Sequence, residues 1–138
     1  MASIGTQASS SAHGRDGIQV LINDHNEMKR LYEAIKAERS SDQKQRLTNE
    51  FIRLMSIHDG IELSTLYPML ESKVQNGKQL ADHARQDHTL SRTDLYELDQ
   101  RKVTDADFEK ILDKLMQVQC RTIRVANVLL ICSQLCVG

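Results

Sequence analysis

The sequence predicts an all-α protein, folded as an up-down-up-down four-helix bundle. Glycine and proline are scarce, with six and one among 138 residues, and no stretch alternates apolar and polar residues as a strand would. Four long segments instead repeat apolar residues at alternating steps of three and four, the pattern of helices that share a core. Because the connections between them are only a few residues long, successive helices should pack antiparallel.

The chain is long enough for one domain with a real core. Residues 1–15 are rich in serine and lack apolar periodicity, so they are expected to form a disordered tail. Residues 16–138 then make up the bundle.

The first helix is expected over about 17–38, and a short loop with a capping residue at its end, 39–42, follows it. The second helix is expected over about 43–74, where Pro68 should bend the axis. The inward positions of the first helix are Ile18, Leu21, His25, Met28, Tyr32 and Ile35. Those of the second are Leu47, Phe51, Leu54, His58, Ile61 or Glu62, Thr65 and Met69.

A turn at Asn76-Gly77 separates the second helix from a third, expected over about 78–99. Thr104 is the predicted N-cap of the fourth helix, which opens with acidic residues. The inner face of the third helix reads Leu80, Ala84, His88, Ser91, Leu95 and Leu98. That of the fourth reads Phe108, Ile111, Leu115, Val118, Thr122, Val125, Leu129, Cys132 and Cys136.

Composition argues against several classes of function. The formal charge is −1, basic residues are spread along the chain, and tryptophan is absent, so neither nucleic acid nor a membrane surface is an expected partner. The apolar run 125–138 is too short to span a membrane. The three cysteines are an odd number gathered near the C-terminus, which favours reduced thiols and a cytoplasmic location.

Three histidines stand out, because His25, His58 and His88 each take an inward position on a different helix. Counted from the turns, His25 and His58 lie about 13 and 15 residues away and are nearly level. Glu62, one helical turn after His58, and His88 lie about 12 and 10 residues from the next turn. Four nitrogen and oxygen donors are therefore expected to meet in one layer of the core.

Buried imidazoles and carboxylates need partners. A metal ion satisfies all four groups and is favoured over a polar hydrogen-bond network, and iron, zinc or manganese suits this donor set. His13 lies in the tail, and His83 lies roughly 140° around the helix from His88, so neither is included. Asp24 and Asp87 are expected to be solvated, with orientation of a ligand as the alternative.

Four stretches resemble successive helices of hemerythrin-like proteins of the HHE cation-binding type: "LINDHNEMKRLYEAI", "FIRLMSIHDGIELSTLYPML", "ARQDHTLSRTDL" and "VTDADFEKILDKLM". The resemblance covers roughly 17–116. It implies a bundle with a non-haem di-iron centre. The ligands it implies are His25, His58, Glu62 and His88, with Glu62 bridging two metals.

The fourth helix departs from the family pattern. The family has a second H-x3-E there, and the matching positions fall near Thr122 and Ala126. Residues 117–138 contain no histidine, aspartate or glutamate, so this C-terminal segment is atypical and the di-iron site is incomplete. Cys120 lies roughly 200° around the helix from Thr122 and is not a substitute.

The resulting hypothesis is a hemerythrin-like protein that binds one or two non-haem iron ions and acts in oxygen or iron binding or sensing, with dioxygen as a candidate ligand. A metal-free interaction module is the first alternative, in which the apolar C-terminal helix self-associates, or a defective isoform. A di-iron oxidase or peroxidase is a further alternative, although nothing in the sequence indicates a substrate pocket and no catalytic residue is assigned.

Overall fold

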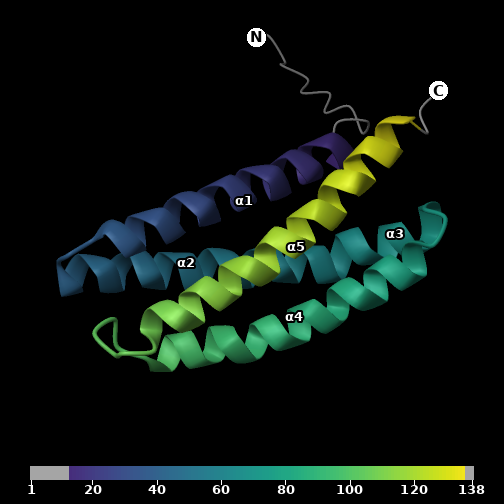
Figure 1. Cartoon of the computed structure of the whole chain (residues 1–138). Helices are drawn as coiled ribbons and strands as arrows, with labels where there is room; N and C mark the ends of the chain where they lie inside the picture. Colours follow the sequence, from purple (N-terminus) through teal and green to yellow (C-terminus); the bar gives the residue numbers. More distant parts are fainter. Residues whose placement is uncertain (1–12, 136–138) are drawn as a thin grey trace, which may run out of the picture.

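The computed structural model describes the backbone of residues 13–135 and the side chains of residues 19–122. Its elements are α1 (His13–Ala37), α2 (Ser41–Ile61), the π-helical turn η1 (Glu62–Leu66), α3 (Tyr67–Lys73), α4 (Gly77–Gln100) and α5 (Phe108–Leu135). The elements α2, η1 and α3 follow one another without a break and make one long rod. The four rods run alternately up and down, and α5 crosses the others obliquely (Figure 1). The predicted all-α four-helix bundle is confirmed.

The helix ends follow local capping chemistry. Ser40 caps α2, two residues ahead of the capping position expected at the end of 39–42, because its side chain accepts a hydrogen bond from the Gln43 N–H at 3.5 Å. The backbone of α1 begins at His13, ahead of the expected start, and residues 1–12 of the predicted tail lie outside the described residues.

The prediction that Thr104 caps the fourth helix is wrong. Helix α5 begins four residues later, at Phe108. Asp105 instead holds a turn, because its carboxylate accepts a hydrogen bond from the Lys102 N–H at 2.8 Å and its carbonyl accepts one from the Phe108 N–H at 3.2 Å.

The turn between α3 and α4 lies at the predicted Asn76-Gly77 pair. Asn76 has a φ of 62°, a left-handed conformation that asparagine tolerates better than most residues. Gly77 is buried, and a side chain there would overlap the backbone carbonyl of Leu70. A residue without Cβ is therefore needed where α4 starts against the end of α3.

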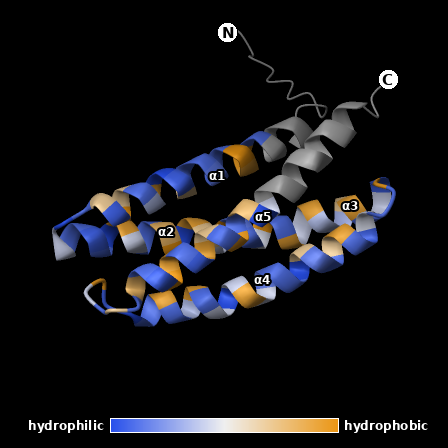
Figure 2. Cartoon of the chain, viewed as in Figure 1, coloured by the Kyte–Doolittle hydropathy of each residue, from blue (hydrophilic) through white to orange (hydrophobic). Residues whose placement is uncertain are grey.

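The core consists of two apolar clusters at different heights of the bundle. Hydrophilic residues cover much of the visible surface of α1 and α4 (Figure 2). One cluster contains Met28, Leu31, Ile35, Phe51, Met55, Leu95, Leu98, Phe108, Ile111, Leu112, Leu115 and Met116. The other contains Leu21, Leu66, Tyr67, Leu70, Ala81 and Ala84. Among the described residues, no helix combines the length and the apolar content needed to cross a membrane.

From Leu21 to Glu62 the predicted inward positions are buried or half-buried, and Met69 is half-buried, but the pattern shifts after Glu62. Thr65, predicted to face inward, is exposed, whereas Leu66 and Leu70 are buried. The reason is η1: the Tyr67 N–H bonds to the Glu62 carbonyl five residues earlier, so this turn holds one more residue than an α-helical turn. Pro68, which has no N–H to donate, lies just after this wide turn, and the bend of the axis expected there stays a prediction.

The remaining inward predictions for the third and fourth helices are confirmed as far as Thr122, with Leu80 half-buried. Those for Ile18, Val125, Leu129, Cys132 and Cys136 concern side chains outside the described residues.

Candidate metal centre

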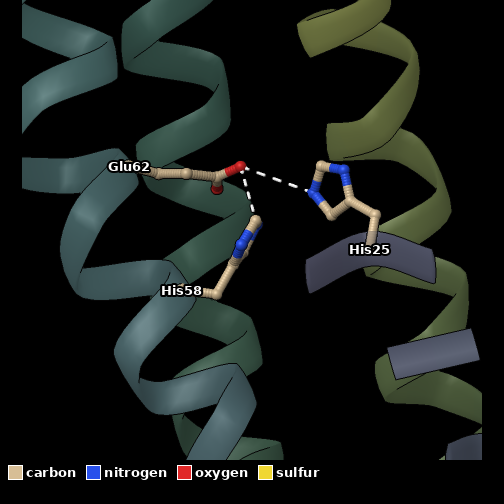
Figure 3. A group of neighbouring side chains, drawn as sticks. All are labelled: His25, His58 and Glu62. Carbon is tan, nitrogen blue, oxygen red and sulfur yellow. Dashed lines mark hydrogen bonds and ion pairs between the residues drawn. The ribbon is translucent and has the colours of Figure 1, made fainter. Parts of the chain in front are cut away.

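Four buried side chains from three rods meet between the two apolar clusters. His25 comes from α1, His58 from α2, Glu62 from η1 and His88 from α4. Their exposed fractions are 7%, 0%, 1% and 2%. Figure 3 shows His25 and His58 pointing from neighbouring helices toward the Glu62 carboxylate. The structure thus brings together the four side chains that the sequence analysis placed in one layer.

One oxygen of Glu62 faces two imidazoles. Its Oε1 lies 2.9 Å from Nε2 of His58 and 3.6 Å from Nε2 of His25. The two rings lie edge to face, with their centroids 4.4 Å apart. Two nitrogens and one oxygen therefore point at a common volume.

The other oxygen of Glu62 faces a third imidazole and a phenol. Its Oε2 lies 2.9 Å from Nε2 of His88 and accepts a hydrogen bond from the Tyr67 hydroxyl at 3.1 Å. The hydroxyl oxygen itself is 2.5 Å from Nε2 of His88. Glu62 is thus the shared member of two donor groups, one on each of its oxygens.

Two aspartates lie behind the histidines, on the ring nitrogens that face away from Glu62. Asp24 Oδ2 is 3.3 Å from Nδ1 of His58, and Asp59 Oδ1 is 3.2 Å from Nδ1 of His88. A carboxylate in this position fixes the tautomer and orientation of an imidazole whose other nitrogen binds a metal. The expectation that Asp24 is solvated is therefore wrong, and its alternative role in orienting a ligand fits the geometry.

Helix α5 contributes Gln119 and Thr122 to the edge of the cluster. The Gln119 amide donates to Asp59 Oδ1 at 3.3 Å, and the Thr122 hydroxyl donates to the Gln119 carbonyl at 2.9 Å. Thr122 is buried as predicted, but its hydroxyl is used inside its own helix. Ala126, the other position of the family motif, has a side chain outside the described residues.

Three buried residues of this region were missed from the sequence: Asp59, Tyr67 and Gln119. Asp59 directly follows His58, and a helix wheel turns adjacent residues about 100° apart, so Asp59 received no inward position. Gln119 lies three residues before Thr122, a predicted inward position, and would have been found if the inner face of the fourth helix had been taken as a wider stripe. Tyr67 lies within a stretch that carries the family resemblance, but periodicity gave it no inward position, because its placement depends on the π turn.

The negative charge of Glu62 and the positive charges of protonated His58 and His88 stabilise one another. Burial alone would raise the pKa of Glu62, but contacts with His25, His58 and His88 outweigh it and hold that pKa well below its usual range. Burial would lower the pKa of His88, yet Asp59 and Glu62 raise it to about 9. The pKa of His58 is likewise raised, because Glu62 and Asp24 outweigh its burial. Burial and the charge of Glu62 raise the pKa of Tyr67.

The donor set fits a cation. His25 Nε2 is buried without a hydrogen-bond partner, although it points at Glu62, and Asp59 Oδ2 is buried without one as well. Unpaired polar atoms in a core are costly, and a cation near Glu62 Oε1 would give His25 Nε2 a partner. Imidazole and carboxylate donors together suit iron, zinc or manganese.

A groove of about 950 Å³ between α1 and α5 reaches this cluster at His25. Lys29 and Glu33 line it on α1, and Gln117 and Cys120 line it on α5. The free thiol of Cys120 is exposed and does not belong to the donor cluster. The groove gives small solutes a route to one edge of the site.

The remaining candidates lie away from the cluster. His83 is exposed, as expected. Asp87 is half-buried and lies 3.9 Å from the Arg121 guanidinium, so it is neither fully solvated nor attached to a ligand histidine. The side chain of His13 lies outside the described residues.

The family model described as Hemerythrin HHE cation binding domain matches residues 16–126. Among curated proteins, an uncharacterized hemerythrin-like protein of Schizosaccharomyces pombe is 29% identical over 98 residues, which cover 70% of this chain and 48% of that protein. The chain therefore spans about half the length of this relative. No solved structure matches this chain significantly.

Proposed function

Because the chain belongs to the hemerythrin HHE cation-binding family, we propose that its buried cluster binds non-haem iron and that the protein acts in iron or oxygen binding or sensing. The observation that carries this proposal is the arrangement around Glu62. Its two oxygens face three imidazoles, each through Nε2, at 2.9 Å, 2.9 Å and 3.6 Å. Imidazoles aimed at one carboxylate are arranged as ligands are around a shared metal.

Two cation positions follow from the geometry. One lies on the Oε1 side of Glu62, where His25 and His58 supply nitrogens. The other lies on the Oε2 side, with His88. Glu62 would bridge them. Iron held here would supply Lewis-acid and redox chemistry.

The surrounding residues prepare the site. Asp24 holds His58 with Nε2 toward Glu62 through a hydrogen-bonded contact at Nδ1, and Asp59 lies 3.2 Å from Nδ1 of His88, near enough to orient that ring when it binds a cation. The apolar clusters above and below exclude water from the carboxylate and make its charge more effective. The α1–α5 groove lets a small molecule approach at His25. These features support binding of a small molecule at the metal, and oxygen is the ligand that we propose.

The proposal is tested by loading the purified chain with ferrous iron, removing free metal and measuring bound metal by mass spectrometry. Wild type should retain iron, and His58→Ala should lose most of it, because one Nε2 donor and the anchor of Asp24 disappear together. The matched control is His83→Ala, which removes an exposed imidazole and should leave the iron content unchanged. Equal iron content in wild type and His58→Ala would refute the proposal.

A further inference from the structure

The two proposed cation positions differ in their supply of donors. The Oε1 side of Glu62 has two imidazoles, from His25 and His58. The Oε2 side has one, from His88. The described part of α5 brings it no histidine or carboxylate, and the Thr122 hydroxyl is already bonded to the Gln119 carbonyl. Asp59 lies close enough to Glu62 and His88 to share a cation with them, and an octahedral ion on this side needs further donors.

We propose that Tyr67 supplies one of these donors, binding a ferric ion through its phenolate oxygen together with Glu62 Oε2 and His88 Nε2. This inference rests on the proposed function, since it concerns the second of the two cation positions.

The first support is the spacing of the three donor atoms. The Tyr67 oxygen lies 3.1 Å from Glu62 Oε2 and 2.5 Å from His88 Nε2, and these two atoms are 2.9 Å apart. With metal–donor distances of about 2.0–2.2 Å, donors at right angles around one ion lie roughly 3 Å apart. The distances from Glu62 Oε2 to the other two atoms match this spacing, and the distance between the Tyr67 oxygen and His88 Nε2 is shorter, so the three atoms lie close enough together to share one ion.

The second support is the backbone that aims Tyr67. In a regular α-helix, a residue five positions after Glu62 would point about 140° away from it. The π turn closes this gap, because the Tyr67 N–H bonds directly to the Glu62 carbonyl. Tyr67 is only 2% exposed. Such turns concentrate at functional sites, and this one places the phenol next to the carboxylate.

The third support is the chemical character of the donor. Asp59 is the other oxygen donor close to Glu62 and His88: its Oδ1 faces Nδ1 of His88 and accepts from Gln119, and its Oδ2 has no hydrogen-bond partner, so it adds a carboxylate to the same position. A phenolate is a hard, anionic oxygen donor and serves as an iron ligand in haem proteins. On binding, the phenol O–H bond breaks, its proton leaves to solvent, an iron–oxygen bond forms, and the iron stays ferric.

The test uses colour, because a phenolate bound to ferric iron gives a visible charge-transfer band and enhanced phenolate ring modes in the resonance Raman spectrum. The full chain is loaded with ferrous iron and oxidised by dioxygen in air. The chain has three tyrosines, so the double variant Tyr32→Phe/Tyr96→Phe keeps Tyr67 alone. Wild type and this double variant should both show the band, and ring-deuterated tyrosine should shift its Raman modes. Tyr67→Phe should bind iron without the band.

The outcomes separate the two proposals. A wild type that takes up no iron refutes the proposed function, and the assignment of Tyr67 falls with it. A wild type that binds iron but shows no phenolate band overturns the Tyr67 proposal alone, and the phenol is then only a hydrogen-bond donor to Glu62. A band that persists in Tyr67→Phe also overturns it. If Tyr67→Phe does not fold, the spectrum and isotope shift of the double variant decide.

Discussion

The rod from Ser41 to Lys73 has two halves that follow different rules. In α2, inward residues recur every three or four positions, and Phe51, Met55 and His58 are buried as a regular helix requires. After Glu62 the same count leads to Thr65, which is exposed, while Leu66 takes the buried place. The regular half supplies core residues and His58, whereas the half with the π turn supplies Glu62 and Tyr67 to the site and Leu66 and Leu70 to the core. One residue of extra length is enough to bring a phenol beside Glu62.

The strongest test of this difference is to delete one exposed serine from each half of the rod. Ser56 and Ser64 are both exposed, and each hydroxyl donates to a carbonyl three or four residues earlier. Deleting Ser56 should cost more than about 5 kcal/mol, because one flank of the helix rotates by about 100° and its core residues move outward.

Deleting Ser64 should cost less than about 2 kcal/mol. It removes the extra residue of the π turn, so Leu66 and Leu70 fall on the inward positions of an ordinary helix. Urea unfolding followed by circular dichroism measures both variants. Equal losses of stability would mean that the two halves do not differ in the way described.

Iron should reduce the difference in hydrogen-exchange rate between the two halves. Without metal, the amides of residues 62–66 should exchange faster than those of α2, because a π turn has poorer helical geometry and is more easily opened locally. At free iron of 100 times its dissociation constant, native-state stabilisation of about 2.7 kcal/mol is expected. The amides of the π turn should then slow toward the rates of α2. Unchanged exchange across the turn would argue against a cation at Glu62.

Substituting an aspartate behind a histidine should weaken the site without harming the fold. Asp24→Asn keeps the shape of the side chain but removes the charge that orients His58. Iron affinity should fall about 10–100-fold, measured by competition with a chelator. Asp99→Asn, an exposed change on α4, is the control and should bind iron as wild type does. If Asp24→Asn bound iron with unchanged affinity, Asp24 would not be needed to orient His58.

The smallest effect is expected outside the donor cluster, at Asp113, which pairs with Lys36 and accepts a hydrogen bond from Tyr32. The hydrogen bond from Lys36 outweighs partial burial and lowers the pKa of Asp113. Its contribution is thus present at neutral pH and is lost as the pH falls through the lowered pKa. Asp113→Asn should cost about 0.2–1 kcal/mol at pH 7. This cost should vanish in acid, as followed by thermal unfolding across pH, and a cost that grows in acid would contradict the sign.

Much of the fold was predictable from the sequence because its periodicity is strong and local. The steps of three and four placed four helices, and the Asn76-Gly77 turn was visible in two residues. The capping prediction at Thr104 failed, because the acidic turn before α5 is held by Asp105, and several residues there could serve as caps. The proposal of self-association through the apolar C-terminal helix depends on side chains beyond Thr122, which lie outside the described residues.

The sequence by itself determined the number and order of the helices and the layer in which His25, His58, Glu62 and His88 come together. Spacing along a helix fixes which face a residue takes, and counting from the turns fixes its height. Only the tertiary structure decided which nitrogens face Glu62 and which residues stand behind them. The π turn depends on packing between rods and on a proline without an N–H, and this combination leaves no periodic signal in the chain.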